Sequence, residues 1–405
     1  MEIKLSKVQQ LSFIIMVLMV SMFNYSEGAL DMLTNVSVVL FVGLTFVRAD
    51  GKLKMPIEMK YFTVFIVMCT ISLLCSTASE ASLNRIIKLL ILMMELAAVY
   101  IYSRQENKDF ILKVVGISTF ITAAFIVVIG LKTIETTKRA NAITGNSNQV
   151  SAYLAFGIMV LIYLLFTKKM KPLIPALGIL TSVAAIVLQG SRTGIAVTGL
   201  MAVVEIIMLI RYENLPISKR LGLFLALILL FSAGVYYIIS NPILYMTIGQ
   251  RFMSLYEIQT TGVSSINETS VFNRMNAYEY AIERFLKNPL FGCGIDSFAA
   301  FSANSDLKGT SFCPNNYLEL LQGIGIFGAT AYYLAYFSIL RKSFLAKKYK
   351  VDELSVLVLC ILLSMLLMHI TVVFYYQKLE YLYLGIMLAI CIGFYEEEKD
   401  ADEIS

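Results

Sequence analysis

The polar residues best suited to chemistry lie in one segment, residues 288–328, NPLFGCGIDSFAAFSANSDLKGTSFCPNNYLELLQGIGIFG. The carboxylates of Asp296 and Glu319 can take a proton from a hydroxyl group, and the amides of Asn315 and Asn316 can donate hydrogen bonds. The segment runs directly into a long apolar stretch. Polar groups at the edge of a membrane helix predict a functional site, because such groups are costly to keep there without a role.

Pro314 stands at the start of that apolar stretch, where its fixed φ suits the first turn of a helix. The free N–H groups and the positive dipole end of such a helix can hold an anion. Further along, Gly323, Gly325 and Gly328 predict close packing against another helix.

Three arginines predicted on one side of the membrane are candidates for binding phosphate: Arg139, Arg192 and Arg274. Arg192 lies in a short turn between two apolar runs, and Ser191 beside it adds a hydroxyl group. Arginine suits phosphate because its planar fork makes two hydrogen bonds at once. The alternatives are snorkelling to lipid headgroups for Arg192, and a solvated charge or an ion pair for the other two.

The composition indicates which elements position these residues. Of the 405 residues, 58% are hydrophobic and 15% are charged, whereas soluble domains carry about 25% charged residues. Apolar runs of about 20 residues, the length that crosses a bilayer, recur along the chain. The predicted fold class is therefore an all-α, polytopic membrane protein. The first run, residues 8–23, lacks a small-residue cleavage site and is expected to be a retained helix.

Twelve membrane spans are predicted: 8–24, 29–47, 61–78, 86–103, 111–131, 150–167, 173–189, 193–211, 221–240, 317–340, 354–376 and 379–395. With the N-terminus in the cytoplasm, 21 of the 33 Lys and Arg residues fall on inner segments, so both termini are predicted to be cytoplasmic. The net charge of +5 then reflects membrane topology. The spread of basic residues over many short loops argues against nucleic-acid binding.

Three parts of the chain are expected. Residues 1–240 hold the first nine spans, residues 241–316 form one long extracytoplasmic loop, and residues 317–405 hold three spans and an acidic cytoplasmic tail. Within the loop, residues 271–287 predict an amphipathic helix on the membrane surface or across the mouth of the bundle. Its apolar face repeats at helical spacing: Val271, Met275, Tyr278, Ile282 and Phe285.

Four motifs, taken in order, resemble one family. They are Arg139 with ANAITGNSN, the GSRTG turn at 190–194, Arg274 at the start of a helix that leads to NPLFGCGIDSF, and PNNYLELLQGIGIFG. Their order on the outer side of a twelve-span topology resembles the O-antigen ligase/polymerase superfamily of bacterial polysaccharide-assembly membrane proteins. The resemblance covers the second half of the chain best.

The resemblance implies a GT-C-like helical bundle in the bacterial cytoplasmic membrane, which transfers a glycan outside the membrane without a metal or another cofactor. The donor would be an oligosaccharide on polyprenyl pyrophosphate. The acceptor would be a second lipid-linked repeat unit in a polymerase, or a lipid A core or another terminal acceptor in a ligase. Membrane lipid, a flippase and chain-length regulators are the partners implied. The three arginines would hold pyrophosphate, and the acceptor side would be lined by Asp296, Asn315 and Glu319.

The chain departs from the family at one position. The family motif commonly reads His-Asn-x-Tyr-Leu-Glu, with the His as the favoured base, but Pro314 stands there and the single histidine is His369. Three hypotheses remain for the proton acceptor: a carboxylate (Asp296 or Glu319), His369 from another helix, or no strong base, because pyrophosphate leaves readily. His369 also fits a histidine packed and hydrogen-bonded between helices. The departure favours a polymerase over a ligase.

Two further alternatives stay open in the sequence. Cys293 and Cys313 flank part of the outer segment, so a disulfide and two free thiols are both compatible with an oxidising outer face. The other four cysteines lie in predicted spans, where Cys acts as a small apolar residue. A transporter would also have about twelve spans, but it is expected to show two related halves, and the halves here are unalike.

Overall fold

The computed structural model describes residues 2–23, 28–49, 55–137, 146–212, 269–302, 311–349 and 353–404, with a few more between 236 and 260. Every regular element in these residues is helical. The long helices are α1 (Glu2–Phe23), α2 (Ala29–Arg48), α3 (Ile57–Ser72), α4 (Ser79–Gln105), α5 (Lys108–Thr137), α6 (Ser147–Phe166), α7 (Leu173–Gln189), α8 (Arg192–Tyr212), α12 (Thr269–Lys287), α14 (Asn316–Tyr349), α15 (Glu353–Met368) and α16 (Lys378–Ile404). The short ones are η1 (Leu73–Cys75), η2 (Tyr245–Gly249) and α13 (Phe298–Ser302).

The predicted all-α, multi-pass fold is confirmed. Eight of the described helices (α1 to α6, α8 and α14) are long and apolar enough to cross a membrane, and α7 and α15 are shorter apolar helices. Eleven of the twelve predicted spans fall on described helices. The remaining one, residues 221–240, lies almost entirely outside the described residues, so the count of twelve and the GT-C-like arrangement stay predictions.

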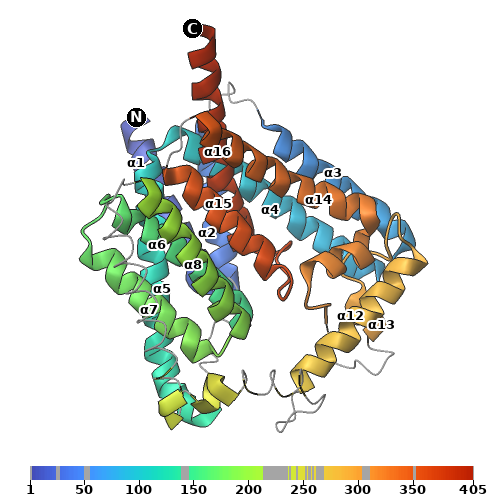
Figure 1. Ribbon diagram of the computed structural model, residues 1–405. Helices are drawn as coiled ribbons and strands as arrows, with labels where there is room; N and C mark the ends of the chain where they lie inside the picture. The colour runs from blue at the N-terminus through green and yellow to red at the C-terminus, as the bar shows by residue number, and fades with distance from the viewer. Residues whose placement is uncertain are drawn as a thin grey trace.

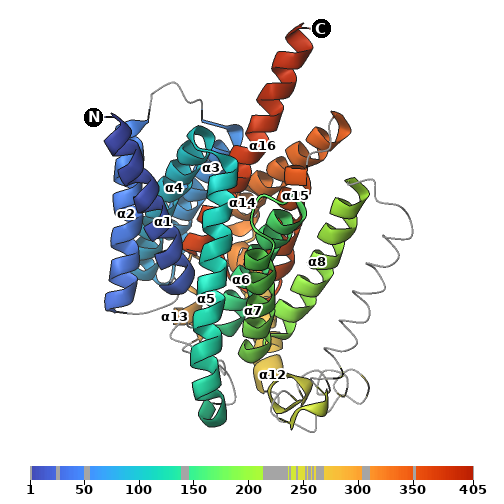
Figure 2. The same cartoon turned by 90° about the vertical axis from the view of Figure 1, so that its left-hand side faces the viewer.

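The two termini lie at the same end of the bundle (Figure 1). The opposite end, called the loop end below, carries α12, α13 and the residues that lead into α14. Figure 2 shows α1 to α4 on one side of the molecule and α6 to α8 on the other. α15 packs against α6 and α8 on one side of the molecule, while α16 packs against α4 and α14. Because α15 and α16 also contact each other, they connect the two sides. α6 lies near the centre, since 89% of its span is buried.

The helix α14 breaks at Gly325, where φ is 68° and ψ is −174°. A side chain is excluded here, because a Cβ atom would lie 2.3 Å from the backbone of Leu290. The N–H group of Ile326, just past the break, donates to the carbonyl of Pro289 at 2.8 Å. Gly325 therefore allows the NPLFG loop to lie against the backbone of α14. The sequence had predicted packing against another helix instead.

The same loop donates hydrogen bonds to backbone carbonyl groups of α14 that lose their helical partners at the break. The N–H groups of Cys293 and Gly294 donate to the carbonyls of Gln322 and Gly323 at 2.8 and 2.9 Å. Gly292 has a φ of +75°, and a Cβ atom there would lie 2.4 Å from the backbone of Gly323. A membrane helix tolerates such a break only where other groups replace its lost hydrogen bonds. The loop and the broken helix thus form one unit.

The predicted span 354–376 is wrong in its last part. The helix α15 ends at Met368, and a non-helical connection runs to α16 at Lys378. Asn316, the first residue of α14, holds this connection in place. Its N–H group donates to the carbonyl of His369 at 2.8 Å, and its side-chain oxygen accepts from the N–H groups of Phe374 and Tyr375 at 2.9 and 3.1 Å.

The helix α12 covers the range predicted for an amphipathic helix, but a different face is buried. The buried positions are Ala277, Ala281 and Arg284. Met275 and Ile282, which belong to the predicted apolar face, are 52% and 45% exposed. Small residues such as Ala277 and Ala281 lie on the buried face because they allow α12 to pack closely against α14.

Candidate functional site

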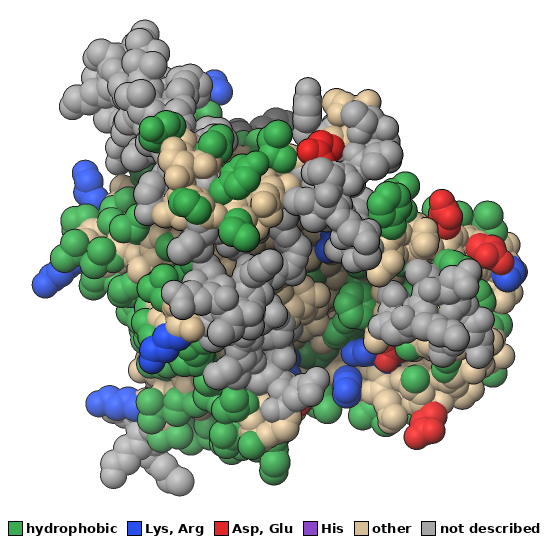
Figure 3. Space-filling view, turned by 90° about the horizontal axis from the view of Figure 1, so that it is seen from below, with side chains coloured by type: hydrophobic (Ala, Val, Ile, Leu, Met, Phe, Trp, Pro, Cys, Tyr) green, Lys and Arg blue, Asp and Glu red, His purple; other side chains and the backbone are tan. Residues whose placement is uncertain are grey.

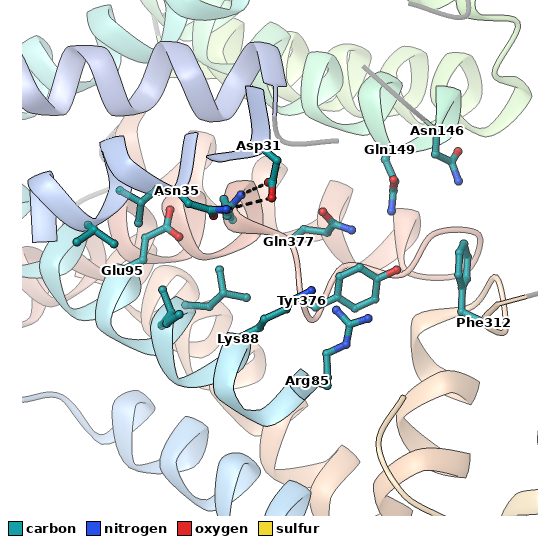
Figure 4. Close-up of a pocket in the computed structure, with 15 residues that line it drawn as sticks. Asp31, Asn35, Arg85, Lys88, Glu95, Asn146, Gln149, Phe312, Tyr376 and Gln377 are labelled. Carbon is teal, nitrogen blue, oxygen red and sulfur yellow. Dashed lines mark hydrogen bonds and ion pairs between the residues drawn. The ribbon is translucent and has the colours of Figure 1, made fainter. Parts of the chain in front are cut away.

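A cavity of about 740 Å³ lies at the loop end between α2, α4, α6 and the connection to α16. Figure 3 shows this end hollowed, with basic and acidic side chains at the hollow. Several elements contribute side chains to the cavity, and Figure 4 draws these side chains as sticks. They are Asp31, Asn35, Val38 and Val39 from α2; Arg85, Lys88, Ile91, Leu92 and Glu95 from α4; Asn146 and Gln149 from α6 and its cap; and Phe312, Tyr376, Gln377 and Lys378.

Arg85 is the most constrained cation of the cavity. Its guanidinium lies 2.9 Å from the carboxylate of Asp296 and 3.9 Å from the centre of the Tyr376 ring. These contacts fix the plane of the guanidinium. Its Nε–H has no hydrogen-bond partner among the described residues. A buried N–H without a partner is rare, so Arg85 presents a held donor that a phosphate oxygen can satisfy.

Asp296, predicted as a catalytic carboxylate, pairs with Arg85 and helps to position its guanidinium, while the catalytic role stays a prediction. It has a φ of 58°, a left-handed conformation that Asp tolerates better than most residues. The neighbouring Ile295 ties this turn to the end of α3 and the start of α4, since its N–H donates to Ser72 Oγ at 3.2 Å and its carbonyl accepts from Ser82 Oγ. The turn is thus clamped from both sides.

Lys88 and Glu95 continue the same face of α4 beyond Arg85. Residues three, four and seven apart share a helix face, so the three side chains form one charged stripe along the cavity. Lys378, at the start of α16, pairs with Asp31 of α2 at 2.9 Å. The cavity lining therefore includes three basic side chains, and two of them, Arg85 and Lys378, already have anionic partners.

The amino-terminal end of α6 also borders the cavity. Asn146 caps this helix by accepting the N–H of Asn148 at 3.0 Å, and Asn146 and Gln149 line the cavity. The positive dipole end of α6 thus lies at the cavity and favours an anion. Ser191, predicted to bind substrate, is 1% exposed; it donates to Asn148 at 2.8 Å and accepts the N–H of Gly194 at 3.1 Å. It caps α8 and joins α8 to α6.

The predicted site residues at the start of α14 (Asn315, Asn316 and Glu319) also have structural partners. Asn315 accepts the N–H of Leu318 at 3.1 Å and so caps the helix. Asn316 is fully buried at the connection to α16, and its amide donates to the Tyr333 hydroxyl at 2.9 Å. Glu319 is 1% exposed and accepts the N–H of Cys313 at 2.8 Å. None of the three lines the cavity between α2, α4 and α6.

His369 lies at the end of α15 and is 0% exposed. Its Nε2 is 3.0 Å from a carboxylate oxygen of Glu380, and its Nδ1 is 3.4 Å from the Tyr333 hydroxyl. Aromatic rings, including Tyr317 and Phe374, surround the imidazole. The structure therefore places His369 in a packed polar cluster and not on the cavity, in line with the structural alternative for this residue.

The three predicted phosphate-binding arginines are not gathered at the cavity. Arg139 lies outside the described residues. Arg192 is half-buried at the first turn of α8, next to the Ser191 cap, and Arg274 is half-buried on α12. Neither of these two lines the cavity. The buried arginine of α12 is Arg284, which is 2% exposed.

Arg284 holds α12 to the broken helix. Its Nε–H donates to Gln322 at 2.9 Å, its Nη2 donates to Ser297 at 2.6 Å, and the guanidinium lies 4.6 Å from the Phe301 ring centre. Burial lowers the pKa of this guanidinium, although arginine stays charged in proteins. Cys293 donates to the carbonyl of Arg284 at 3.3 Å. Cys293 and Cys313 are both free thiols, so the alternative of a disulfide is not realised.

The residues that the sequence analysis missed are Arg85, Lys88 and Glu95. A signal was present, because Lys88 and Glu95 fall inside the predicted span 86–103. Ionisable side chains within a membrane span usually face a cavity or a partner. Their spacing of seven residues also places them on one helix face.

The comparisons with known proteins agree with the motifs. Residues 177–333 match the model of a family described as O-antigen ligase. None of the curated proteins matches the chain. The matched residues run from α7 to the middle of α14, so they include the GSRTG turn, α12 and the break at Gly325. This match over residues 177–333 supports a relation to the O-antigen ligase/polymerase superfamily, which the motifs also resemble.

Proposed function

We propose that this protein is a polymerase that joins oligosaccharide repeat units carried on polyprenyl pyrophosphate, at the outer face of the bacterial cytoplasmic membrane. The observation that carries the proposal is the cavity at the loop end, where Arg85 and Lys88 lie on one face of α4. The loop end would then face outward and both termini would face the cytoplasm, as the distribution of Lys and Arg predicts.

The cations suit the pyrophosphate of the donor. Arg85 keeps a free Nε–H donor, and Lys88 lies about one helical turn further along α4. The dipole end of α6 adds partial positive charge near Asn146. When the bond to the sugar breaks, negative charge builds up on the pyrophosphate, and these groups stabilise that charge. Pairing with Asp296 fixes Arg85 in advance, so little reorganisation is needed.

The apolar side of the cavity suits the polyprenyl chain. Val38 and Val39 of α2 and Ile91 and Leu92 of α4 contribute apolar side chains to the cavity lining. A second groove, of about 380 Å³, runs along the outer side of α2 and shares Asp31, Asn35 and Val39 with the cavity. Val39 is 59% exposed, so this groove faces the surface that lipid would cover. A lipid-linked substrate can enter by this route without leaving the bilayer.

A ligase that transfers the glycan to a terminal acceptor is the second candidate. Pro314 favours the polymerase, because it replaces the histidine that the family motif commonly carries. The capsule, exopolysaccharide and O-antigen all remain candidate products, and we infer only that the product is a polymer of lipid-linked repeat units.

Deletion of the gene, followed by gel analysis of surface polysaccharide and of extracted lipid-linked intermediates, tests the proposal. A polymerase predicts loss of long chains and accumulation of single repeat units on the lipid. Long chains that stay on the polyprenyl lipid would instead identify a ligase. An intact polymer without any lipid intermediate would overturn both and favour transport.

Complementation then tests the cavity. Arg85→Ala should restore no long chains at a normal protein level. Lys287→Ala is the matched control, because this residue is 59% exposed on α12, where it pairs with Glu283 one helical turn earlier and lies 5.9 Å from the Phe301 ring centre; it should complement fully. Full complementation by Arg85→Ala would remove this cavity from the proposed mechanism.

A further inference from the structure

Glu95 of α4 is a buried carboxylate that lines the cavity and has no visible partner. The residue is 0% exposed, and neither of its carboxylate oxygens has a hydrogen-bond partner within the part of the chain that the structure describes. Buried polar atoms are nearly always hydrogen-bonded, because leaving one unpaired is costly. A donor from a bound molecule would satisfy this carboxylate.

The other buried glutamates near the bundle centre do not share this position. Glu58 pairs with Lys342 at 2.7 Å, Glu319 accepts a backbone N–H, and Glu380 contacts His369. Glu205 of α8 is also 0% exposed with two unpartnered oxygens, but it does not line the cavity. Glu95 thus combines an open carboxylate with access to the substrate space.

The place of Glu95 along α4 relates it to the proposed phosphate site. Glu95 follows Lys88 by seven residues, which is about 10 Å along the helix axis. Side chains on a helix tilt toward its N-terminus, so the Glu95 side chain leans toward Lys88. In Figure 4 it rises from α4 toward α2, on the side of Asn35. A sugar whose pyrophosphate lies at Lys88 would have its reacting carbon between these two groups.

We propose that Glu95 is the proton acceptor for the attacking hydroxyl group of the acceptor glycan. The inference rests on the proposed function and supplies the base that Pro314 leaves missing from the family motif. The hydroxyl oxygen forms a bond to the anomeric carbon of the donor, and its proton passes to a carboxylate oxygen of Glu95. The bond between that carbon and the pyrophosphate breaks, and the electron pair leaves with polyprenyl pyrophosphate.

The test uses the full-length protein in lipid nanodiscs, with lipid-linked repeat units extracted from the deletion strain. Glu95→Gln keeps the size of the side chain and removes its basicity. Its kcat should fall at least about 100-fold, since general-base catalysis contributes about 10²–10⁴-fold, while KM for the lipid-linked substrate changes less than about threefold. Glu205→Gln removes an equally buried carboxylate away from the cavity, and it should keep kcat within about twofold.

A second variant separates catalysis from folding. In Glu95→Ala, added sodium formate should restore transfer at least about tenfold, because the small carboxylate can occupy the vacated space and accept the proton. Lost activity without rescue, together with a lowered thermal midpoint, would show a structural role and overturn the inference. A kcat of Glu95→Gln within threefold of wild type, or an effect on KM alone, would also overturn it. Wild-type protein that makes no polymer would refute the proposed function instead.

Discussion

Two buried polar regions of this protein differ in how fully their hydrogen bonds are made. The Asn316 cluster, made of Asn316, Tyr333, His369 and Glu380, joins α14, α15 and α16. Asn316 uses its backbone N–H, its side-chain oxygen and its amide group, and both ring nitrogens of His369 have partners. Within the described residues, one carboxylate oxygen of Glu380 is the buried side-chain atom of this cluster that lacks a hydrogen bond. The α4 wall, made of Arg85, Lys88 and Glu95, keeps open donors and acceptors at a cavity.

The difference teaches that polarity inside a membrane protein has two separate uses. Where a helix ends inside the bundle, polar side chains replace the hydrogen bonds that the backbone loses. Where a cavity must take a charged substrate, polar side chains are held by neighbours but left partly unsatisfied. The prediction of a site at His369 and Asn316 did not distinguish these uses, because the sequence shows polar residues but not their partners.

The largest expected effect is on folding, from Asn316→Leu. The variant removes the acceptor for the N–H groups of Phe374 and Tyr375 and the donor for Tyr333. Since each buried group left unpaired costs about 1–3 kcal/mol, the free energy of unfolding should fall by about 3–5 kcal/mol. Thermal unfolding in detergent measures this. A normal midpoint with lost transfer would instead give Asn316 a direct role with substrate.

The next largest effect is expected from Arg85→Lys, which should lower activity but leave folding unchanged. Lysine keeps the charge but cannot reproduce the fork held between Asp296 and Tyr376. Transfer by the purified protein should fall about 10–100-fold, while the thermal midpoint stays within a few degrees of wild type. Unchanged transfer would mean that charge alone suffices here, and that the held geometry of the α4 wall is unimportant.

A smaller effect is expected from His369→Gln. Glutamine keeps one donor and one acceptor but cannot reach both Glu380 and Tyr333, so stability should fall by about 1–2 kcal/mol. The kcat of the folded protein should stay within about threefold of wild type. A 100-fold loss of kcat at normal stability would show that His369 takes part in catalysis, and the comparison between the two regions would fail.

Thiol labelling compares the access of reagents to the two regions. In a Cys75→Ser background, which removes the exposed thiol, Lys88→Cys should react with a water-soluble maleimide because it faces the cavity. Cys313 near α14 should react only after unfolding. Burial raises the pKa of its thiol, so less of the reactive thiolate is present at neutral pH. Rapid labelling of Cys313 in the folded protein would contradict the described packing.

The sequence by itself determined the class of the protein, most of its helices and the family that its second half resembles. Apolar runs near bilayer length predict membrane helices because backbone polar groups must be satisfied within lipid. The helical period of 271–287 placed α12, and the order of the motifs pointed to the family that residues 177–333 match. These are local properties of the chain, so they can be predicted without a structure.

Only the tertiary structure decided which polar residues line the cavity and which are used in hydrogen bonds within the fold. The face of α12 that is buried depends on α14, the role of Gly325 depends on a loop about 35 residues earlier, and Asp296 acquires its role from Arg85, which lies 211 residues before it. A hydrogen bond depends on where both partners lie in space. The sequence therefore identified polar candidates, but the fold determined that the α4 wall faces the cavity and that Asn316 and His369 do not.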